Sequence, residues 1–196
     1  MAIDAKTVAQ LREMTNAGMM DAKKALEETN GDLDAAAENL RKKGIAKAVK
    51  KADRLTNEGR VHAYVHGTGK LGVLVEVLCE TDFVARNEAF LELCNDLALH
   101  VSASDPLYVS RDAVPVELVE KQKAMIREES APNAKSPEIL EKMVEGRLSK
   151  WYQETVLLEQ PFVKDEDKTV EDLLKEKIAL LGENMQIRRF ARFQIG

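Results

Sequence analysis

The chain has few of the residues that build disulfide frameworks and metal centres, and it has no long apolar run. It contains two cysteines and three histidines in 196 residues. Cys79 and Cys94 are too few for a disulfide framework or a cysteine-rich zinc site, so we expect buried, reduced thiols. No apolar run approaches the ~20 residues of a membrane-spanning helix, and the N-terminus lacks the basic and apolar segments of a secretory signal. The composition therefore predicts a soluble, cytoplasmic protein that does not associate with a membrane.

The spacing of the three histidines does not indicate a metal site. His62 and His66 fall on one face of a predicted strand, where a rise of ~3.3 Å per residue puts their β-carbons roughly 13 Å apart. That distance is too long for a shared metal ion, and His100 is the only other histidine. We expect neither a metal nor a cofactor.

The sequence also lacks an excess of positive charge. Its 29 Lys and Arg against 34 Asp and Glu give a formal net charge of -5, whereas nucleic-acid binding normally needs a basic domain or stripe. One basic segment runs from Arg41 to Arg54, with Asp53 as its single acid. It is typical of a solvated linker; the alternatives are a surface that steers an acidic partner, or an RNA tether. The acidic balance disfavours the tether, so we expect no direct contact with nucleic acid.

Motifs of enzymatic chemistry are missing as well. The run 67–72 has the glycine spacing of a dinucleotide fingerprint, but a β-branched run follows it where that fingerprint needs the N-terminus of a helix. No serine, histidine and acid are grouped in a way that indicates a nucleophilic mechanism. The sequence predicts a protein that is not an enzyme and binds no nucleotide itself.

The first 45 residues predict a domain of three short helices. Asp4 can cap the first helix, which should end near Asn16–Gly18, and the second should span about Met20–Thr29. Asp32 can cap the third, which Gly44 should stop. Short helices with this Gly-Met, Ala-Leu and Gly-turn pattern are typical of ubiquitin-associated (UBA) modules. We therefore predict a UBA-like domain at 1–45 and a basic linker at 46–57.

Beyond the linker, apolar residues alternate and then recur at helical spacing. With 44% hydrophobic residues, the chain can bury a real core. The patterns predict two strands joined by a hairpin turn, a series of helices and a closing strand. The strands are expected at 61–66, 71–79 and 185–195, and the helices at 87–102, 115–130, 136–158 and 170–181. The predicted fold class is α+β, with residues 58–196 forming a core of a small antiparallel sheet packed with helices.

One polar corner carries a large aromatic residue directly after the second strand. The run Cys79–Asn87 reads CETDFVARN, so that Phe83 is flanked by an acid and followed closely by a base. A phenylalanine here can pack into the protein's own core, as most do. The alternative is an aromatic anchor that fills a pocket on another protein.

Four runs together resemble a known family. They are Leu11–Leu26, Thr81–Asn87, Glu159–Asp165 and Gly182–Phe190, and they occur in the family's order over nearly the whole chain. The chain resembles elongation factor Ts, the nucleotide-exchange factor of elongation factor Tu. Two positions depart from the family's usual pattern: Asn16, where glycine is usual, and Leu78, where asparagine often stands.

The resemblance implies a guanine-nucleotide exchange factor in translation elongation. Such a factor binds elongation factor Tu in its GDP-bound and nucleotide-free states and promotes GDP release by disturbing the magnesium and phosphate site. It implies that Asp82 and Phe83 contact the nucleotide domain of that partner. The neighbouring residues would shape the corner: Thr81, Val84, Ala85 and Arg86.

The resemblance also implies a second contact and an oligomeric state. The family's N-terminal domain docks on the same partner domain, which transfers a contact role to Met19, Met20 and Lys23. The two methionines can instead pack inside the three-helix core. The core is short beside family members with a duplicated core, and short forms are homodimers, so we predict a homodimer through the sheet. The rival hypothesis is a UBA-like interaction adaptor without exchange activity.

Overall fold

The computed structural model describes residues 3–15 and 17–196 of the chain. Its described residues form two compact units. Unit 1 comprises the described residues of Met1–Gly59 together with Leu78–Leu93 and Asp172–Gln186, and unit 2 comprises Arg60–Val77, Cys94–Glu171 and Ile187–Gly196. The fold is α+β, as predicted, whereas the division at 1–45, 46–57 and 58–196 stays a prediction.

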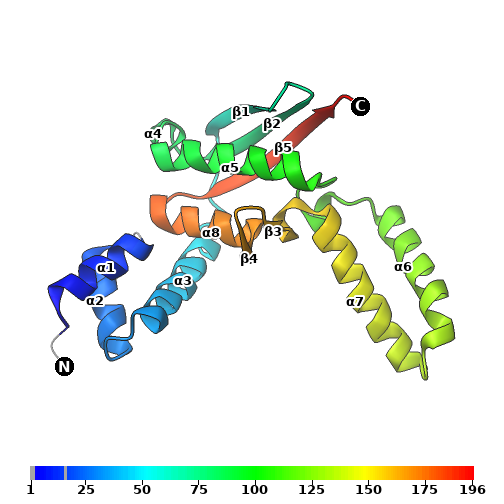
Figure 1. The fold of residues 1–196 in the computed structure, drawn as a ribbon, viewed down its shortest axis with the longest axis horizontal. Helices are drawn as coiled ribbons and strands as arrows, with labels where there is room; N and C mark the ends of the chain where they lie inside the picture. Colours follow the sequence, from blue (N-terminus) through cyan, green and yellow to red (C-terminus); the bar gives the residue numbers. More distant parts are fainter. Residues whose placement is uncertain (1–2, 16) are drawn as a thin grey trace. The chain divides into compact units, whose positions relative to one another are not determined.

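Unit 1 begins with three helices around a small apolar core (Figure 1): α1 (Ala5–Thr15), α2 (Met19–Glu28) and α3 (Leu33–Val49). Asp32 caps α3 by accepting the backbone N–H of Ala35 at 2.9 Å, as its position predicts. Small and branched side chains of all three helices fill the core: Val8, Leu11, Ala22, Ala25, Leu26 and Ala36. The three predicted helices are confirmed; the predicted turn at Asn16 lies outside the described residues.

The predicted stop at Gly44 is wrong, because α3 continues through this residue to Val49. A mid-helix glycine costs only ~1 kcal/mol relative to alanine, and continuing the helix keeps its hydrogen bonds. The presence of glycine at position 44 is explained better by close packing than by the end of a helix. A β-carbon at Gly44 would lie 3.2 Å from that of Ala179 in α8 (Val170–Leu181), so glycine permits a close approach of the two helices.

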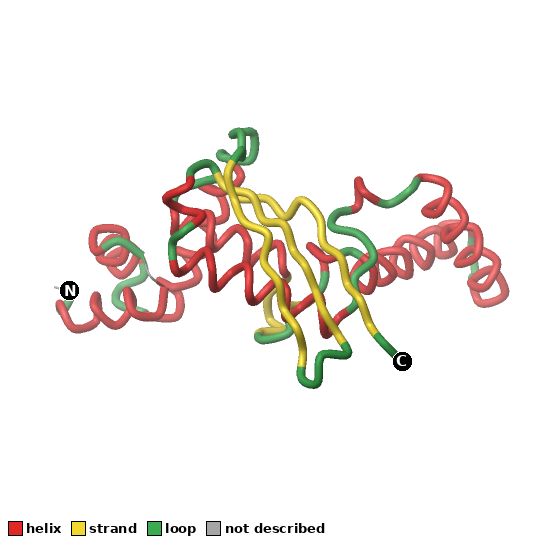
Figure 2. Tube along the Cα trace, turned by 90° about the horizontal axis from the view of Figure 1, so that it is seen from above, coloured by secondary structure: helices red, strands yellow, loops and turns green. Residues whose placement is uncertain are grey.

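The sheet has the strand order β1-β2-β5 (Figure 2). Its strands are β1 (Glu58–His66), β2 (Leu71–Cys79) and β5 (Met185–Gln194). Alternate residues of β2 are buried, namely Val73, Val75, Val77 and Cys79, which gives this strand one inward face. The predicted turn between β1 and β2 is present, and Gly67 and Gly69 adopt positive φ of 51° and 85° there, which favours glycine.

Helix α5 (Glu88–Ser104) follows the polar corner, and two long helices come after it in unit 2. These are α6 (Val116–Ser130) and α7 (Pro137–Thr155), which lie side by side as a hairpin in Figure 1. Short 3-10 turns occur at Arg111–Ala113, Ala131–Asn133 and Leu157–Glu159. Val114, Tyr152 and Val156 form the buried cluster beside this hairpin. Helix α7 ends three residues before the predicted 158, since Val156 already has an extended backbone.

The sequence patterns missed a short antiparallel hairpin in unit 2. It pairs β3 (Pro161–Phe162) with β4 (Asp165–Thr169). Buried His100 holds it: its Nδ1 accepts the backbone N–H of Val163 at 3.2 Å, and its Nε2 lies 2.9 Å from Oε1 of Gln160. The two residues of β3 and the polar run of β4 offer no alternating apolar pattern to detect.

Candidate partner-binding site

The predicted anchor residue lies at the surface. Phe83 is 83% exposed, so its ring is not part of the protein's own core. It belongs to α4 (Asp82–Ala85), a single helical turn that directly follows β2 and residues 80 and 81. We call Thr81–Arg86 the Phe83 turn. Of the two alternatives that the sequence left open, packing in the protein's own core is wrong, and the role of an anchor for another protein stays a prediction.

Local chemistry explains why this segment is helical and why the ring faces outward. Thr81 caps the turn: its Oγ1 accepts the N–H of Val84 at 3.4 Å, and its carbonyl accepts the N–H of Ala85 at 3.1 Å. Residues two apart on a helix differ by about 200° in direction. Because Ala85 is buried, the side chain at position 83 points the opposite way, into solvent.

The polar rim of the turn is also exposed. Asp82 and Arg86 form an ion pair at 3.1 Å between Oδ2 and Nη2. Exposed pairs of this kind contribute 0–1 kcal/mol, so this pair orders the rim only weakly. Val84 is half-buried. The predicted corner residues therefore divide into an outer rim of Asp82, Phe83 and Arg86, in which Asp82 is half-buried, and an inner side of Thr81, Val84 and Ala85.

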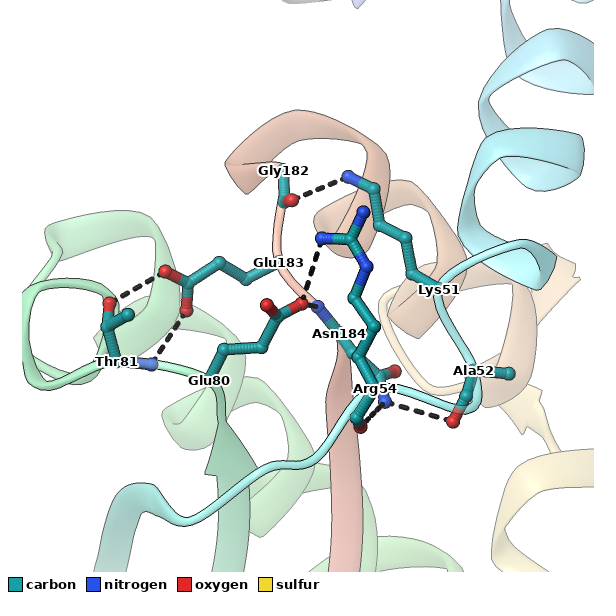
Figure 3. Close-up of polar contacts among 8 residues, drawn as sticks. All are labelled: Lys51, Ala52, Arg54, Glu80, Thr81, Gly182, Glu183 and Asn184. Atoms are coloured by element: carbon teal, nitrogen blue, oxygen red, sulfur yellow. Dashed lines mark hydrogen bonds and ion pairs between the residues drawn. The ribbon is translucent and has the colours of Figure 1, made fainter.

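A distant carboxylate clamps the start of the turn (Figure 3). Glu183 accepts the hydroxyl of Thr81 on Oε1 at 2.6 Å and the N–H of Thr81 on Oε2 at 3.0 Å. The thiol of Cys79 donates to the carbonyl of Thr81 at 3.2 Å. Thr81 is thus bonded through its N–H, its hydroxyl and its carbonyl.

The loop that carries Glu183 is itself tied down on both sides. We call Gly182–Asn184 the 182–184 loop. The N–H of Asn184 donates to Glu80 at 2.6 Å, and its side-chain amide donates to the carbonyls of Ala52 at 3.1 Å and Arg54 at 2.8 Å. Figure 3 shows these bonds joining the loop to Glu80, the residue after β2, and to the segment after α3.

Two basic residues complete this network. Lys51 donates to the carbonyl of Gly182 at 2.6 Å, and Arg54 lies 3.4 Å from the carboxylate of Glu80. Gly182 has a φ of 80°, a conformation that glycine adopts without strain. The network therefore joins residues 51–54, 80–81 and 182–184 within unit 1.

The cysteine below the turn is a structural thiol. Burial and then the charge of Glu183 raise the pKa of Cys79 to about 11. The protonated thiol can therefore donate its hydrogen bond to Thr81 at neutral pH, and it is a poor nucleophile. Cys79 and Cys94 are both buried, and neither forms a disulfide, as the sequence predicts.

The second predicted contact group lies at the start of α2. Met19 and Met20 are 61% and 75% exposed, so neither packs inside the three-helix core. Lys23 is exposed and lies 3.9 Å from Glu27. Met20 and Lys23 line a shallow hollow together with Asp21, Lys24 and Glu27. This part of α2 therefore presents flexible apolar side chains beside mixed charges.

The basic segment uses much of its charge within the protein. Lys43 pairs with Glu28 at 2.6 Å and Lys47 with Asp21 at 3.3 Å. A hydrogen bond from Arg41 lowers the pKa of Glu38 to about 2. Lys51 and Arg54 also bond to groups of this protein. Several basic side chains of the segment are therefore engaged in contacts within the protein and do not form a continuous basic surface for a partner.

In residues 3–15 and 17–196, no group of three or more His, Cys, Asp or Glu side chains could hold a metal ion. Over the same residues, no helix is long and apolar enough to cross a membrane.

Comparison with known proteins identifies the family. The sequence profile described as Elongation factor TS matches residues 2–196. The chain belongs to the elongation factor Ts family.

Three relatives named elongation factor Ts are matched over 90% or more of their own length. The elongation factor Ts of Acetivibrio thermocellus is 56% identical over 194 residues, which cover 99% of this chain and 90% of that protein. The corresponding values for Moorella thermoacetica are 54%, 99% and 96%. The elongation factor Ts of Coprothermobacter proteolyticus is 53% identical over 196 residues and is matched completely on both sides.

The fold brings together two of the four runs on which the family resemblance rests. The run at 81–87 and the run at 182–190 meet through Thr81 and Glu183, which are 102 positions apart. Sequence reasoning assigned no role to Glu80, Glu183 or Asn184. Glu80 lies next to the run at 81–87, and Glu183 and Asn184 lie inside the run at 182–190. Position in or near a run is a weak signal, because it does not reveal which residues are in contact.

Proposed function

We propose that this chain is a guanine-nucleotide exchange factor that binds elongation factor Tu, GDP-bound and nucleotide-free, and promotes GDP release in translation elongation. The observation that carries the proposal is an 83% exposed phenylalanine on a clamped helical turn in a chain of the elongation factor Ts family. The factor forms and breaks no covalent bond, so the proposed activity is not that of an enzyme.

Exchange requires the factor and the nucleotide to weaken each other's binding. Binding coupling is reciprocal, so a factor that weakens GDP binding a thousandfold is itself bound a thousandfold less tightly when GDP is present. Such coupling corresponds to ~4 kcal/mol, and a buried aromatic anchor supplies ~2–4 kcal/mol. Phe83 can supply this energy because the ring leaves no core contacts behind when it enters a partner. With Asp82 contacting the same nucleotide domain, the Phe83 ring would enter near the magnesium site and loosen the metal and the phosphates.

A second docking surface supports the same partner interaction. Met19 and Met20 are exposed at the start of α2, with Lys23 one turn further along. Methionine side chains adapt to irregular apolar surfaces, and a lysine can meet an acidic partner. We propose that these three residues hold the partner while the Phe83 turn acts on the nucleotide site.

The sheet supports the proposed homodimer. Val61, Val65, Leu74 and Phe193 are exposed apolar residues of β1, β2 and β5. Such clusters mark interaction surfaces. Glu76 on the central strand accepts hydrogen bonds from Arg189 at 2.6 Å and Arg188 at 2.9 Å, which lower its pKa. Its charge is thus compensated within the chain, which lowers the cost of covering this face.

The deciding experiment measures GDP release from elongation factor Tu with the parent and with Phe83→Ala. Truncation removes the anchor, so we expect stimulation to fall on the order of a hundredfold, the equivalent of ~2–4 kcal/mol. Leu107→Ala removes another exposed apolar side chain, in unit 2, and serves as the matched control. Equal stimulation by a folded Phe83→Ala would refute the anchor. Micromolar binding of ubiquitin without exchange would favour the adaptor hypothesis.

A further inference from the structure

We infer that Glu183 is a positioning residue for the Phe83 turn: it orients the exposed ring through its two hydrogen bonds to Thr81. This inference rests on the proposed exchange function. Glu183 is not one of the predicted contact residues. It would affect the partner only indirectly, by holding Thr81.

The turn cannot hold its own orientation. A helix of four residues is unstable by itself, because nucleation costs more than one turn of hydrogen bonds returns. The Phe83 ring adds no packing, since it is 83% exposed. The Asp82–Arg86 pair is exposed on both sides and contributes little. The orientation of the ring must therefore come from contacts on the inner side of the turn.

The strongest of those contacts is the Glu183 carboxylate. It binds two donors of one residue, at 2.6 Å and 3.0 Å, and hydrogen bonds to an ionised acceptor are roughly twice as strong as neutral ones. Two bonds from two oxygens also fix the rotation of Thr81, which a single bond would leave free. Because Thr81 is the N-cap of α4, fixing it fixes the direction in which the turn starts.

Glu183 can act as a clamp because its own backbone is held. Lys51 binds the residue before it, and Asn184 after it bonds to Glu80 and to two carbonyls of the 52–54 segment. Asn184 is 2% exposed, so its own three bonds are partly shielded from water, whereas the Lys51 bond is exposed. The 182–184 loop therefore connects the Phe83 turn to the segment that follows α3.

The test separates positioning from general stability. Glu183→Gln keeps the side-chain volume but replaces one acceptor oxygen with an NH2 group, so one of the two Thr81 donors loses its partner. The protein is labelled with 4-fluorophenylalanine, which reports on its five phenylalanines, and Phe83→Leu assigns the Phe83 resonance. GDP release from elongation factor Tu is then measured across factor concentrations.

We expect Glu183→Gln to broaden or shift the Phe83 resonance and to leave the Phe162 resonance of unit 2 unchanged. The maximal rate of GDP release should fall about tenfold, while the half-saturating factor concentration changes less than about twofold because the α2 contact surface is intact. Glu141→Gln, which breaks an exposed ion pair with Arg127 on α6 and α7, is the matched control and should change neither quantity.

Two results would overturn the inference: an unchanged Phe83 resonance, whatever the rate of GDP release, or an unchanged maximal rate beside an active parent. If Glu183→Gln does not fold, Glu183→Asp keeps the charge but draws the carboxylate one methylene away from Thr81, leaves the Thr81 cap of α4 in place, and is judged by the same criteria. A parent that does not speed GDP release would refute the proposed function instead, and the resonance would still decide whether Glu183 orders the turn.

Discussion

At the scale of single residues, Phe83 and Phe90 are seven positions apart and have opposite surroundings. Phe83 is exposed and Phe90 is fully buried in α5. Burying an aromatic side chain of this size stabilises a fold by about 1.5–3 kcal/mol, and the Phe83 ring forgoes that gain. A side chain that contributes so little to folding is free to contribute to binding.

This contrast predicts how the two residues affect stability. Phe83→Ala should change the free energy of unfolding by less than about 0.5 kcal/mol, as surface substitutions do. Phe90→Ala should lower it by about 3–5 kcal/mol, because it leaves a cavity in the core. Urea unfolding of both variants measures the difference. A loss of several kcal/mol in Phe83→Ala would mean that the ring packs against the protein in solution.

His100 predicts a pH dependence of stability. Burial lowers its pKa below the ordinary value of 6.5, because the interior disfavours the imidazolium. Between the two pKa values the unfolded chain binds a proton that the folded chain does not. The contribution of His100 is therefore complete above pH ~6.5 and is lost as the pH falls below that value toward the folded pKa.

Urea unfolding at several pH values between 5 and 8 tests this, with the parent compared with His100→Gln. The variant lacks the titrating group, so its stability should decline less steeply below pH ~6.5 than that of the parent. Parallel profiles for the two proteins would show that His100 does not contribute to the acid sensitivity.

At the scale of elements, two mid-helix glycines have different surroundings. Gly44 in α3 would place a β-carbon 3.2 Å from Ala179, whereas a β-carbon at Gly146 in α7 would meet nothing within 4 Å. Alanine is favoured over glycine in helices by up to ~1 kcal/mol. The gain should be available at Gly146 and opposed by contact at Gly44.

We therefore expect Gly146→Ala to stabilise the protein by about 0.4–1 kcal/mol. Gly44→Ala should gain clearly less, and Gly44→Leu should destabilise the protein by about 1–3 kcal/mol through overpacking. Urea denaturation of the three variants provides the comparison. A Gly44→Leu variant as stable as the parent would contradict the close packing of α3 and α8.

Elements with local signals were predicted well. Helix α8 was predicted at 170–181 and found at Val170–Leu181, because apolar spacing alone defines it. The capping role of Asp32 was predicted and found. The errors fall where distant contacts decide: Gly44 next to Ala179, and the β3–β4 hairpin held by His100.

At the scale of the whole molecule, the proposed homodimer depends on the exposed face of the sheet. The double variant Val61→Lys, Val65→Lys adds two positive charges to this face. A sheet-to-sheet dimer would have to bury both charges without partners. We expect this variant to sediment as a monomer at concentrations where the parent is a dimer. Val116→Lys on α6, at another exposed valine, is the control and should remain a dimer.

Analytical ultracentrifugation of the parent, the double sheet variant and the Val116→Lys control measures the oligomeric state of each. A monomeric parent at micromolar concentration would refute the homodimer. A dimeric parent whose sheet variant also stays dimeric would place the interface elsewhere.

The sequence alone determined most of the helices, the three strands of the main sheet, the α+β class, the family resemblance and the candidate residues at Asp82 and Phe83. Caps, periodicity and turn residues act over a few positions, so they can be recognised without the fold. Only the tertiary structure decided that Phe83 is exposed and that Glu183 holds Thr81 from 102 positions away. Local patterns specify which residues face a core, but chain folding decides which distant carboxylate meets which hydroxyl.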